Sequence, residues 1–100
     1  MPLTMNANAT IATHIRAYPA FAQALLEEAA ALYLKGETNT AKSMLHTLVS
    51  ATVGYEHLAT QVARPQRCLQ RMLSRSGRLT MRNLAAIFQT LTDSQHIAPR

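Results

Sequence analysis

Apolar residues recur at every third or fourth position along most of the chain, and this spacing is the strongest constraint on its fold. The clearest run contains Phe21, Ala24, Leu25, Ala29 and Leu32. Such spacing brings side chains to one face of an α-helix, whereas a half-buried strand requires alternation of apolar and polar residues. No alternating segment competes with the helical pattern anywhere in the sequence. The sequence therefore predicts an all-α fold.

Five to six helices are expected, separated by Pro, Gly and short polar segments. They cover residues 11–18, 19–35, 38–53, 55–63, 65–73 and 81–92. The last one carries an apolar stripe that begins at Met81, and residues 93–100 have no period, so this tail is expected to fray. One hundred residues suffice for one modest core, so residues 1–100 are expected to form a single helical domain.

The two shortest segments, 55–63 and 65–73, follow each other almost directly. A helix of about nine residues is unstable alone, so each must pack on the other and on longer helices. A scaffold helix, a tight turn and a second helix held out from the body are typical of a helix-turn-helix. The sequence therefore predicts this motif at about residues 55–73.

The net positive charge of the chain lies entirely in its second half. Residues 1–53 carry three basic and three acidic side chains, whereas residues 54–100 carry seven arginines and two acids and so hold the whole net charge of +5. Six arginines without an intervening acid form an arginine cluster: Arg64, Arg67, Arg71, Arg75, Arg78 and Arg82. The planar donors of arginine suit phosphates and guanine edges, so the cluster indicates a nucleic-acid partner.

Two other interpretations of the arginine cluster stay open. It can be a solvated basic face that only keeps the protein in solution, although such faces usually mix both signs of charge. Its spacing of three and four residues would also suit one continuous helix that binds RNA or lies on a membrane surface. Ser74, Ser76 and Gly77 argue against that continuity, because Ser and Gly lower helicity and favour a turn.

The segment 65–73 has two chemically different sides. Leu69, Met72 and Leu73 form the apolar one, and the opposite one carries four donor-rich side chains that are expected to read base edges: Gln66, Arg67, Gln70 and Arg71. Gln pairs with adenine and Arg with guanine, although ordinary solvent exposure is the alternative for the two glutamines. Four flanking arginines are expected to bind DNA phosphates: Arg64, Arg75, Arg78 and Arg82.

No pattern of catalytic residues occurs, so neither an enzyme nor a cofactor is expected. The four histidines are scattered without carboxylates at ligand spacing, which argues against a metal site. Cys68 is expected to be a small, partly buried core residue, with activation of its thiol by Arg67 and Arg71 as the alternative. The longest uncharged run, residues 1–15, is too short and too polar to span a bilayer, so a cytoplasmic protein without a membrane partner is expected.

An ordered set of short segments extends over about residues 3–92. In the second half it comprises Leu58-Ala59, Pro65, Leu69-x-Arg71-Met72-Leu73-Ser74, Gly77, Thr80 and Asn83-Leu84. In the first half it comprises Pro19-Ala20-Phe21, Leu25-Leu26-x-Glu28-Ala29, Gly36-Glu37 and Ala51-Thr52-Val53-Gly54-Tyr55-Glu56. This set resembles the HigA-like antitoxins, also called addiction-module antidote proteins, a family of small bacterial helix-turn-helix transcriptional regulators.

The resemblance implies a λ-repressor-like helix-turn-helix domain that binds operator DNA, generally as a homodimer. It further implies that segment 65–73 is the recognition helix, with Gln66, Arg67, Gln70 and Arg71 facing the major groove. A RelE/HigB-type ribonuclease toxin is implied as a further partner. The protein would then be the antitoxin of a type II toxin–antitoxin module and would repress its own operon.

Three places differ from the family's usual sequence. Ala63 stands where glycine is often found, and because a left-handed alanine costs roughly 1 kcal/mol, a different turn geometry is expected. Arg64 replaces a Thr or Ser and cannot cap through a hydroxyl. The loop reads Gly77-Arg78-Leu79-Thr80 instead of Gly-Asn-Pro-Thr. The two arginines introduced in this way add positive charge beside segment 65–73.

A protein-interaction module is the rival interpretation. The neutral helices 19–35 and 38–53 would then bind a toxin or another partner, without specific DNA binding by the basic half. Glu27, Glu28 and Glu37 would be its contacts with a basic nuclease, and ordinary solvation of these carboxylates is the alternative.

Overall fold

The computed structural model of the protein describes the backbone of residues 11–97 and the side chains of residues 11–94. Within these limits the chain is helical and contains no strand, which confirms the predicted all-α class. A short helix over residues 11–17 precedes five further helices. These are α2 (Pro19–Leu34), α3 (Thr38–Ala51), α4 (Gly54–Val62), α5 (Gln66–Met72) and α6 (Met81–Ile97).

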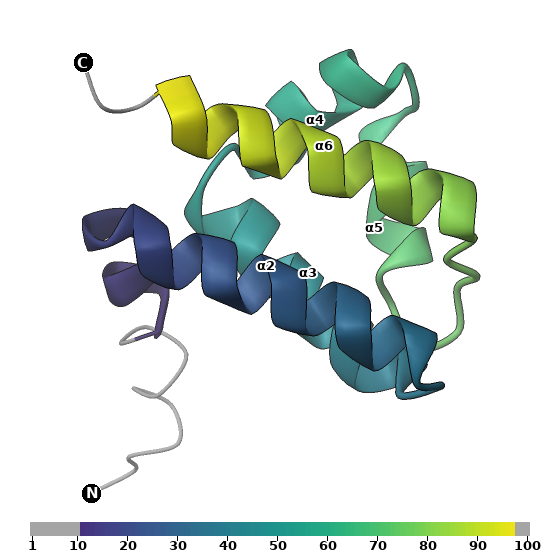
Figure 1. Cartoon of the computed structure of the whole chain (residues 1–100). Coiled ribbons are helices and arrows are strands. Elements are labelled where there is room, and N and C mark those ends of the chain that lie inside the picture. The colour runs from purple at the N-terminus through teal and green to yellow at the C-terminus, as the bar shows by residue number, and fades with distance from the viewer. Residues whose placement is uncertain (1–10, 98–100) are drawn as a thin grey trace, which may run out of the picture.

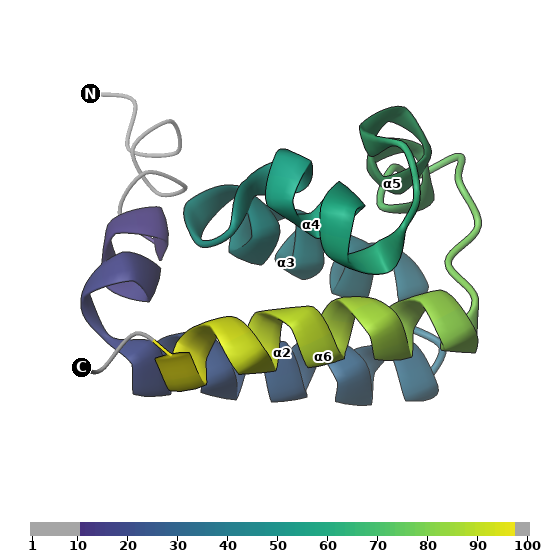
Figure 2. The same ribbon diagram turned by 90° about the horizontal axis from the view of Figure 1, so that it is seen from above.

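The long helices α2 and α6 run along one side of the molecule, and α4 and α5 lie on the other (Figure 1 and Figure 2). Helix α3 packs extensively against α2 and also contacts α4, so it joins the two sides. Helix α5 lies at the end of the molecule where α2 ends and α6 begins, and it packs chiefly against α4 (Figure 2). Every helix supplies side chains to one continuous core, whose largest fully buried members are Ile15, Leu26, Leu45, Leu48, Val49, Leu58, Leu69, Ile87 and Leu91.

Glycine ends α2 as the sequence predicts. Gly36 has a φ of 93°, a left-handed conformation that glycine adopts without a steric penalty. The amide of Gly36 donates to the Tyr33 carbonyl at 3.1 Å, and the amide of Glu37 donates to the Leu32 carbonyl at 2.8 Å. This pair of bonds is the Schellman motif, which satisfies the last carbonyls of the helix and turns the chain towards α3.

The last helix differs from the prediction at both of its ends. The sequence predicts a frayed tail from residue 93, but α6 continues to Ile97, and residues 98–100 lie outside the described part. One reason is local, because the Gln89 side-chain amide donates to the Asp93 carboxylate one turn further along, at 2.8 Å. At the other end Met81, expected to begin the apolar stripe, is 51% exposed because it lies at the rim of the bundle.

No helix within residues 11–97 combines the length and the apolar character that crossing a membrane requires.

Candidate nucleic-acid interface

Three residues connect α4 to α5, and their backbone sets the direction of α5. Ala63 is left-handed, with φ 62° and ψ 45°, and among the described residues it is the only non-glycine with a positive φ. The next amide, that of Arg64, donates back to the Ala59 carbonyl at 3.1 Å. The expectation that Ala63 would impose a different turn is therefore wrong: the left-handed turn forms with alanine and bears its strain of roughly 1 kcal/mol.

Helix α5 begins directly after Pro65, whose extended backbone (φ −61°, ψ 146°) is its N-cap. No side chain caps this end, in agreement with the absence of a hydroxyl at Arg64. The helix has only seven residues, so its stability depends on packing rather than on its own hydrogen bonds. Leu69, Met72 and the following Leu73 supply that packing, because all three are buried in the core.

The side of α5 away from the core carries polar side chains, as the sequence predicts. All four candidates for base reading are exposed on this one helix: Gln66, Arg67, Gln70 and Arg71. Cys68, expected to be partly buried, is exposed as well. The reason is that α5 packs chiefly against a single helix, α4, so its flanks stay uncovered.

The four arginines predicted to bind phosphates surround α5 along the chain. Arg64 lies in the turn before it, Arg75 and Arg78 lie in the loop after it, and Arg82 lies in the first turn of α6. Each of them is exposed. No arginine of the cluster forms an ion pair with another described residue, so their charges are unneutralised by side chains in this part of the chain.

The loop between α5 and α6 is fastened by two side chains that the sequence does not single out. Lys42 of α3 is only 4% exposed, and its Nζ donates to the Gly77 carbonyl at 2.6 Å and to the Ser74 carbonyl at 3.1 Å. Tyr33 of α2 donates its hydroxyl to the Leu79 carbonyl at 2.6 Å. The sequence does hold one signal for Lys42, because it shares a helical face with buried Leu45 and Val49 at i, i+3 and i+7.

The same loop folds back against the end of α5. Ser74 donates both its amide and its hydroxyl to the Arg71 carbonyl, at 3.1 and 2.7 Å. The Gly77 amide donates to the Ser74 carbonyl at 3.2 Å, which closes a tight turn. A Cβ at Gly77 would overlap the Arg71 carbonyl oxygen, so only glycine fits at this close approach.

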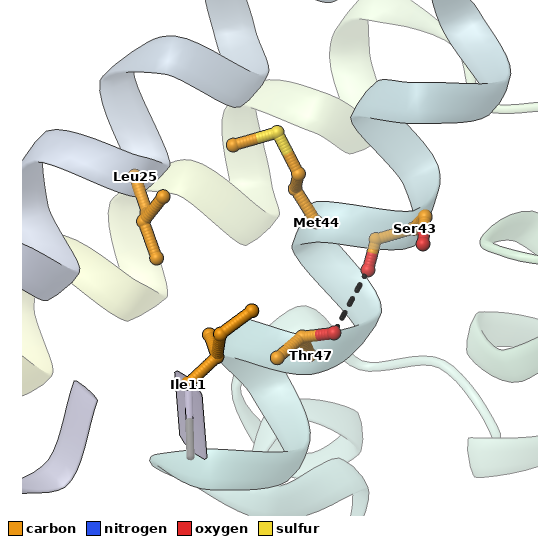
Figure 3. Close-up of a pocket in the computed structure, with 5 residues that line it drawn as sticks. All are labelled: Ile11, Leu25, Ser43, Met44 and Thr47. Atoms are coloured by element: carbon orange, nitrogen blue, oxygen red, sulfur yellow. Dashed lines mark hydrogen bonds between the residues drawn. The ribbon is translucent and has the colours of Figure 1, made fainter. Parts of the chain in front are cut away.

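Two of the hollows elsewhere in the described part of the chain are lined mainly by apolar side chains. One, of 160 Å³, lies between residues 11–17, α2 and α3 and is lined by Ile11, Leu25, Ser43, Met44 and Thr47 (Figure 3). The hydroxyl of Thr47 in this hollow donates its hydrogen to the Ser43 carbonyl at 3.2 Å, so that hydrogen is not available to a ligand. The other, of 320 Å³, lies between α2 and α6 and is apolar, with Leu34 (69% exposed) and Met81 on its rim. Among the described residues no three His, Cys, Asp or Glu side chains gather to hold a metal ion.

Comparison of the chain with known protein families, with curated proteins and with solved structures gives no match.

Proposed function

We propose that the protein binds double-stranded DNA in a sequence-specific manner, with α4 and α5 as a helix-turn-helix of the λ-repressor type. The observation that carries this proposal is the exposure of four donor-rich side chains on one short helix whose other side is buried in the core. A helix supported in this way can enter a major groove about 12 Å wide without exposing the core.

The chemistry of the exposed side suits base edges. Gln66 and Gln70 offer amides that can pair with adenine, and Arg67 and Arg71 offer guanidinium groups that can pair with guanine. None of these four side chains bonds to another described residue, so their donors are available to a ligand. The helix would therefore read a few base pairs directly, with each good bidentate pair supplying about 1–3 kcal/mol of discrimination.

The flanking arginines would supply affinity and register. Arg64 precedes α5, and Arg75, Arg78 and Arg82 follow it, so exposed guanidinium groups at both ends of α5 would meet the phosphates that flank the groove. Each bound phosphate releases counterions, which makes binding weaker as salt increases. Such contacts position the protein on any duplex and leave the choice of sequence to α5.

The biological role follows as part of the same proposal. A homodimer would bind two half-sites about 34 Å apart, and occupation of a promoter would repress transcription by exclusion. The resemblance to HigA-like antitoxins supports autorepression of an operon that also encodes a RelE/HigB-type ribonuclease toxin. Neutralisation of that toxin would be a second task of the same molecule.

A protein-interaction module is the second candidate, and one observation favours it. Leu34 and Met81 are both more than half exposed beside the apolar hollow between α2 and α6. Exposed apolar patches often mark protein interfaces. This surface lies outside α5, so binding of a protein there is compatible with DNA binding by α5.

The proposal is tested by selection from a pool of random duplexes. The wild-type protein is expected to enrich one sequence class, and the Arg67→Ala/Gln70→Ala variant is expected to lose that enrichment. Arg16→Ala is the matched control, because Arg16 is an exposed arginine in residues 11–17, outside the cluster. Wild-type protein that enriches no sequence would contradict specific DNA binding and would leave the interaction module as the better interpretation.

A further inference from the structure

Two side chains from the body of the protein hold the loop after α5 at three of its carbonyls. Lys42 donates to the carbonyls of Ser74 and Gly77, and Tyr33 donates to that of Leu79. The two loop arginines alternate with these anchor points: Arg75 lies between the first two and Arg78 between the last two. Each arginine therefore extends into solvent from backbone that is fixed on both sides.

Stability alone is a poor explanation for a buried lysine at this position. Removal of an ammonium group from water is costly, and no described carboxylate forms an ion pair with Lys42. An apolar side chain of similar size would avoid that cost and fill the same space. What the ammonium does provide is two hydrogen bonds, and both are directed at the loop that carries the arginines.

We infer that Lys42 and Tyr33 are positioning residues for phosphate binding: they hold the loop in one conformation, so that Arg75 and Arg78 meet the DNA backbone without prior ordering of the chain. This inference rests on the proposed function. It assigns a role in DNA affinity to two residues of α2 and α3, the helices that carry none of the arginine cluster. A loop that is ordered before binding loses less conformational freedom on binding, which favours the complex.

Lys42→Met tests the inference, because it removes the ammonium and keeps the apolar stem. Its affinity for any duplex is expected to fall about tenfold, as the ordering of two long side chains and their loop would then accompany binding. Backbone amides of residues 75–79 should exchange hydrogen faster than in the wild type. Lys35→Met is the matched control, since it removes the same charge from an exposed lysine and should leave both readouts unchanged.

A double-mutant cycle separates positioning from a general structural effect. In an Arg75→Ala/Arg78→Ala background Lys42→Met is expected to change affinity by less than about twofold, because the side chains through which it acts are gone. A fall in affinity that stays tenfold in that background would overturn the inference. So would a Lys42→Met variant that binds duplex as tightly as the wild type.

Tyr33→Phe keeps the inference testable if Lys42→Met fails to fold, because it removes only the hydroxyl that donates to the Leu79 carbonyl. It should weaken binding about twofold to fivefold and lose this effect in the same Arg75→Ala/Arg78→Ala background. Unchanged binding by Tyr33→Phe and Lys42→Met, with a wild type that binds duplex, overturns the inference and leaves the proposed function intact. A wild type that binds no duplex overturns both.

Discussion

The body of the molecule and its arginine-bearing end are stabilised in different ways. Helices α2, α3 and α6 have 14 to 17 residues each, and buried apolar side chains hold them together. Helix α5 has seven residues and depends on a small apolar side, while the loop after it combines one buried side chain, Leu79, with hydrogen bonds from Lys42 and Tyr33. The difference shows how a small core can leave one helix largely exposed. Few side chains anchor such a helix, so each of them contributes a larger share of its stability than a core residue contributes to a long helix.

The largest effects are expected where the core anchors each region. Leu26 in α2 and Leu69 in α5 are both fully buried, so Leu26→Ala and Leu69→Ala should each lower the free energy of unfolding by about 2–5 kcal/mol. Only Leu69→Ala should also release α5, so that amides of residues 66–72 exchange much faster than those of α2. Equal protection of α5 and α2 in that variant would show that Leu69 is not the anchor of α5.

A smaller loss of stability is expected from a side chain added to the loop. Gly77→Ala places a Cβ against the Arg71 carbonyl and should lower the free energy of unfolding by about 1–3 kcal/mol as the loop shifts. Gly36→Ala is a useful comparison, because its Cβ would meet open space and only the φ of 93° opposes it, at about 1 kcal/mol. Urea unfolding measures both, and a Gly77→Ala variant as stable as the wild type would argue against the close approach.

A substitution in the turn before α5 should increase the stability of the protein instead of lowering it. Ala63→Gly relieves the left-handed alanine and is expected to stabilise the protein by about 0.5–1 kcal/mol. The same substitution at Ala24, an exposed position within α2, should destabilise it by about 1 kcal/mol. Opposite signs in thermal unfolding confirm the strained turn, and a loss of stability in both variants contradicts it.

Alkaline pH should produce the smallest change, and it acts on α4, the helix that packs against α3 and α6 of the body as well as against α5. Burial raises the pKa of Tyr55 from 10.0 to about 12. Because the folded protein favours the neutral phenol, this contribution to stability is complete below pH 10 and is lost as the pH rises through about 12. Tyr55→Phe should remove that part of the alkaline loss, whereas Tyr18→Phe, at an exposed site, should retain it. Urea midpoints at about pH 9 and about pH 11.5 measure the difference, and identical profiles for both variants would contradict it.

The sequence predicts most of the fold because the information needed is local. The 3.6-residue period marks the helices and separates Leu69 and Met72 from the polar side of α5, and Gly36 marks the end of α2. Exposure of Cys68 depends on which helices surround α5, and exposure of Met81 depends on where the bundle ends. Neither the surroundings of a helix nor its position in the bundle is encoded in the spacing of its own residues.

The candidate site is likewise predictable from the sequence only where it depends on local spacing. Its exposed donors follow from helical period, but the fastening of the loop joins residues 32 to 46 positions apart in the chain. A lysine such as Lys42 is usually solvated, so its type gives no indication of burial. The left-handed conformation of Ala63 is not predicted either, because the packing of α5 on α4 outweighs the preference of a single alanine.

The most direct test of the account is the ratio of affinities for a selected duplex and for a scrambled duplex of the same composition. This ratio corresponds to a difference in binding free energy between the two duplexes. Arg67→Ala/Gln70→Ala should reduce that difference by about 1–3 kcal/mol for each base pair that the variant no longer reads. Arg75→Ala/Arg78→Ala should weaken binding to both duplexes alike. It should also reduce the slope of log affinity against log salt concentration by about one for each arginine. An Arg67→Ala/Gln70→Ala variant that keeps the wild-type ratio would contradict the claim that the outer side of α5 reads base edges.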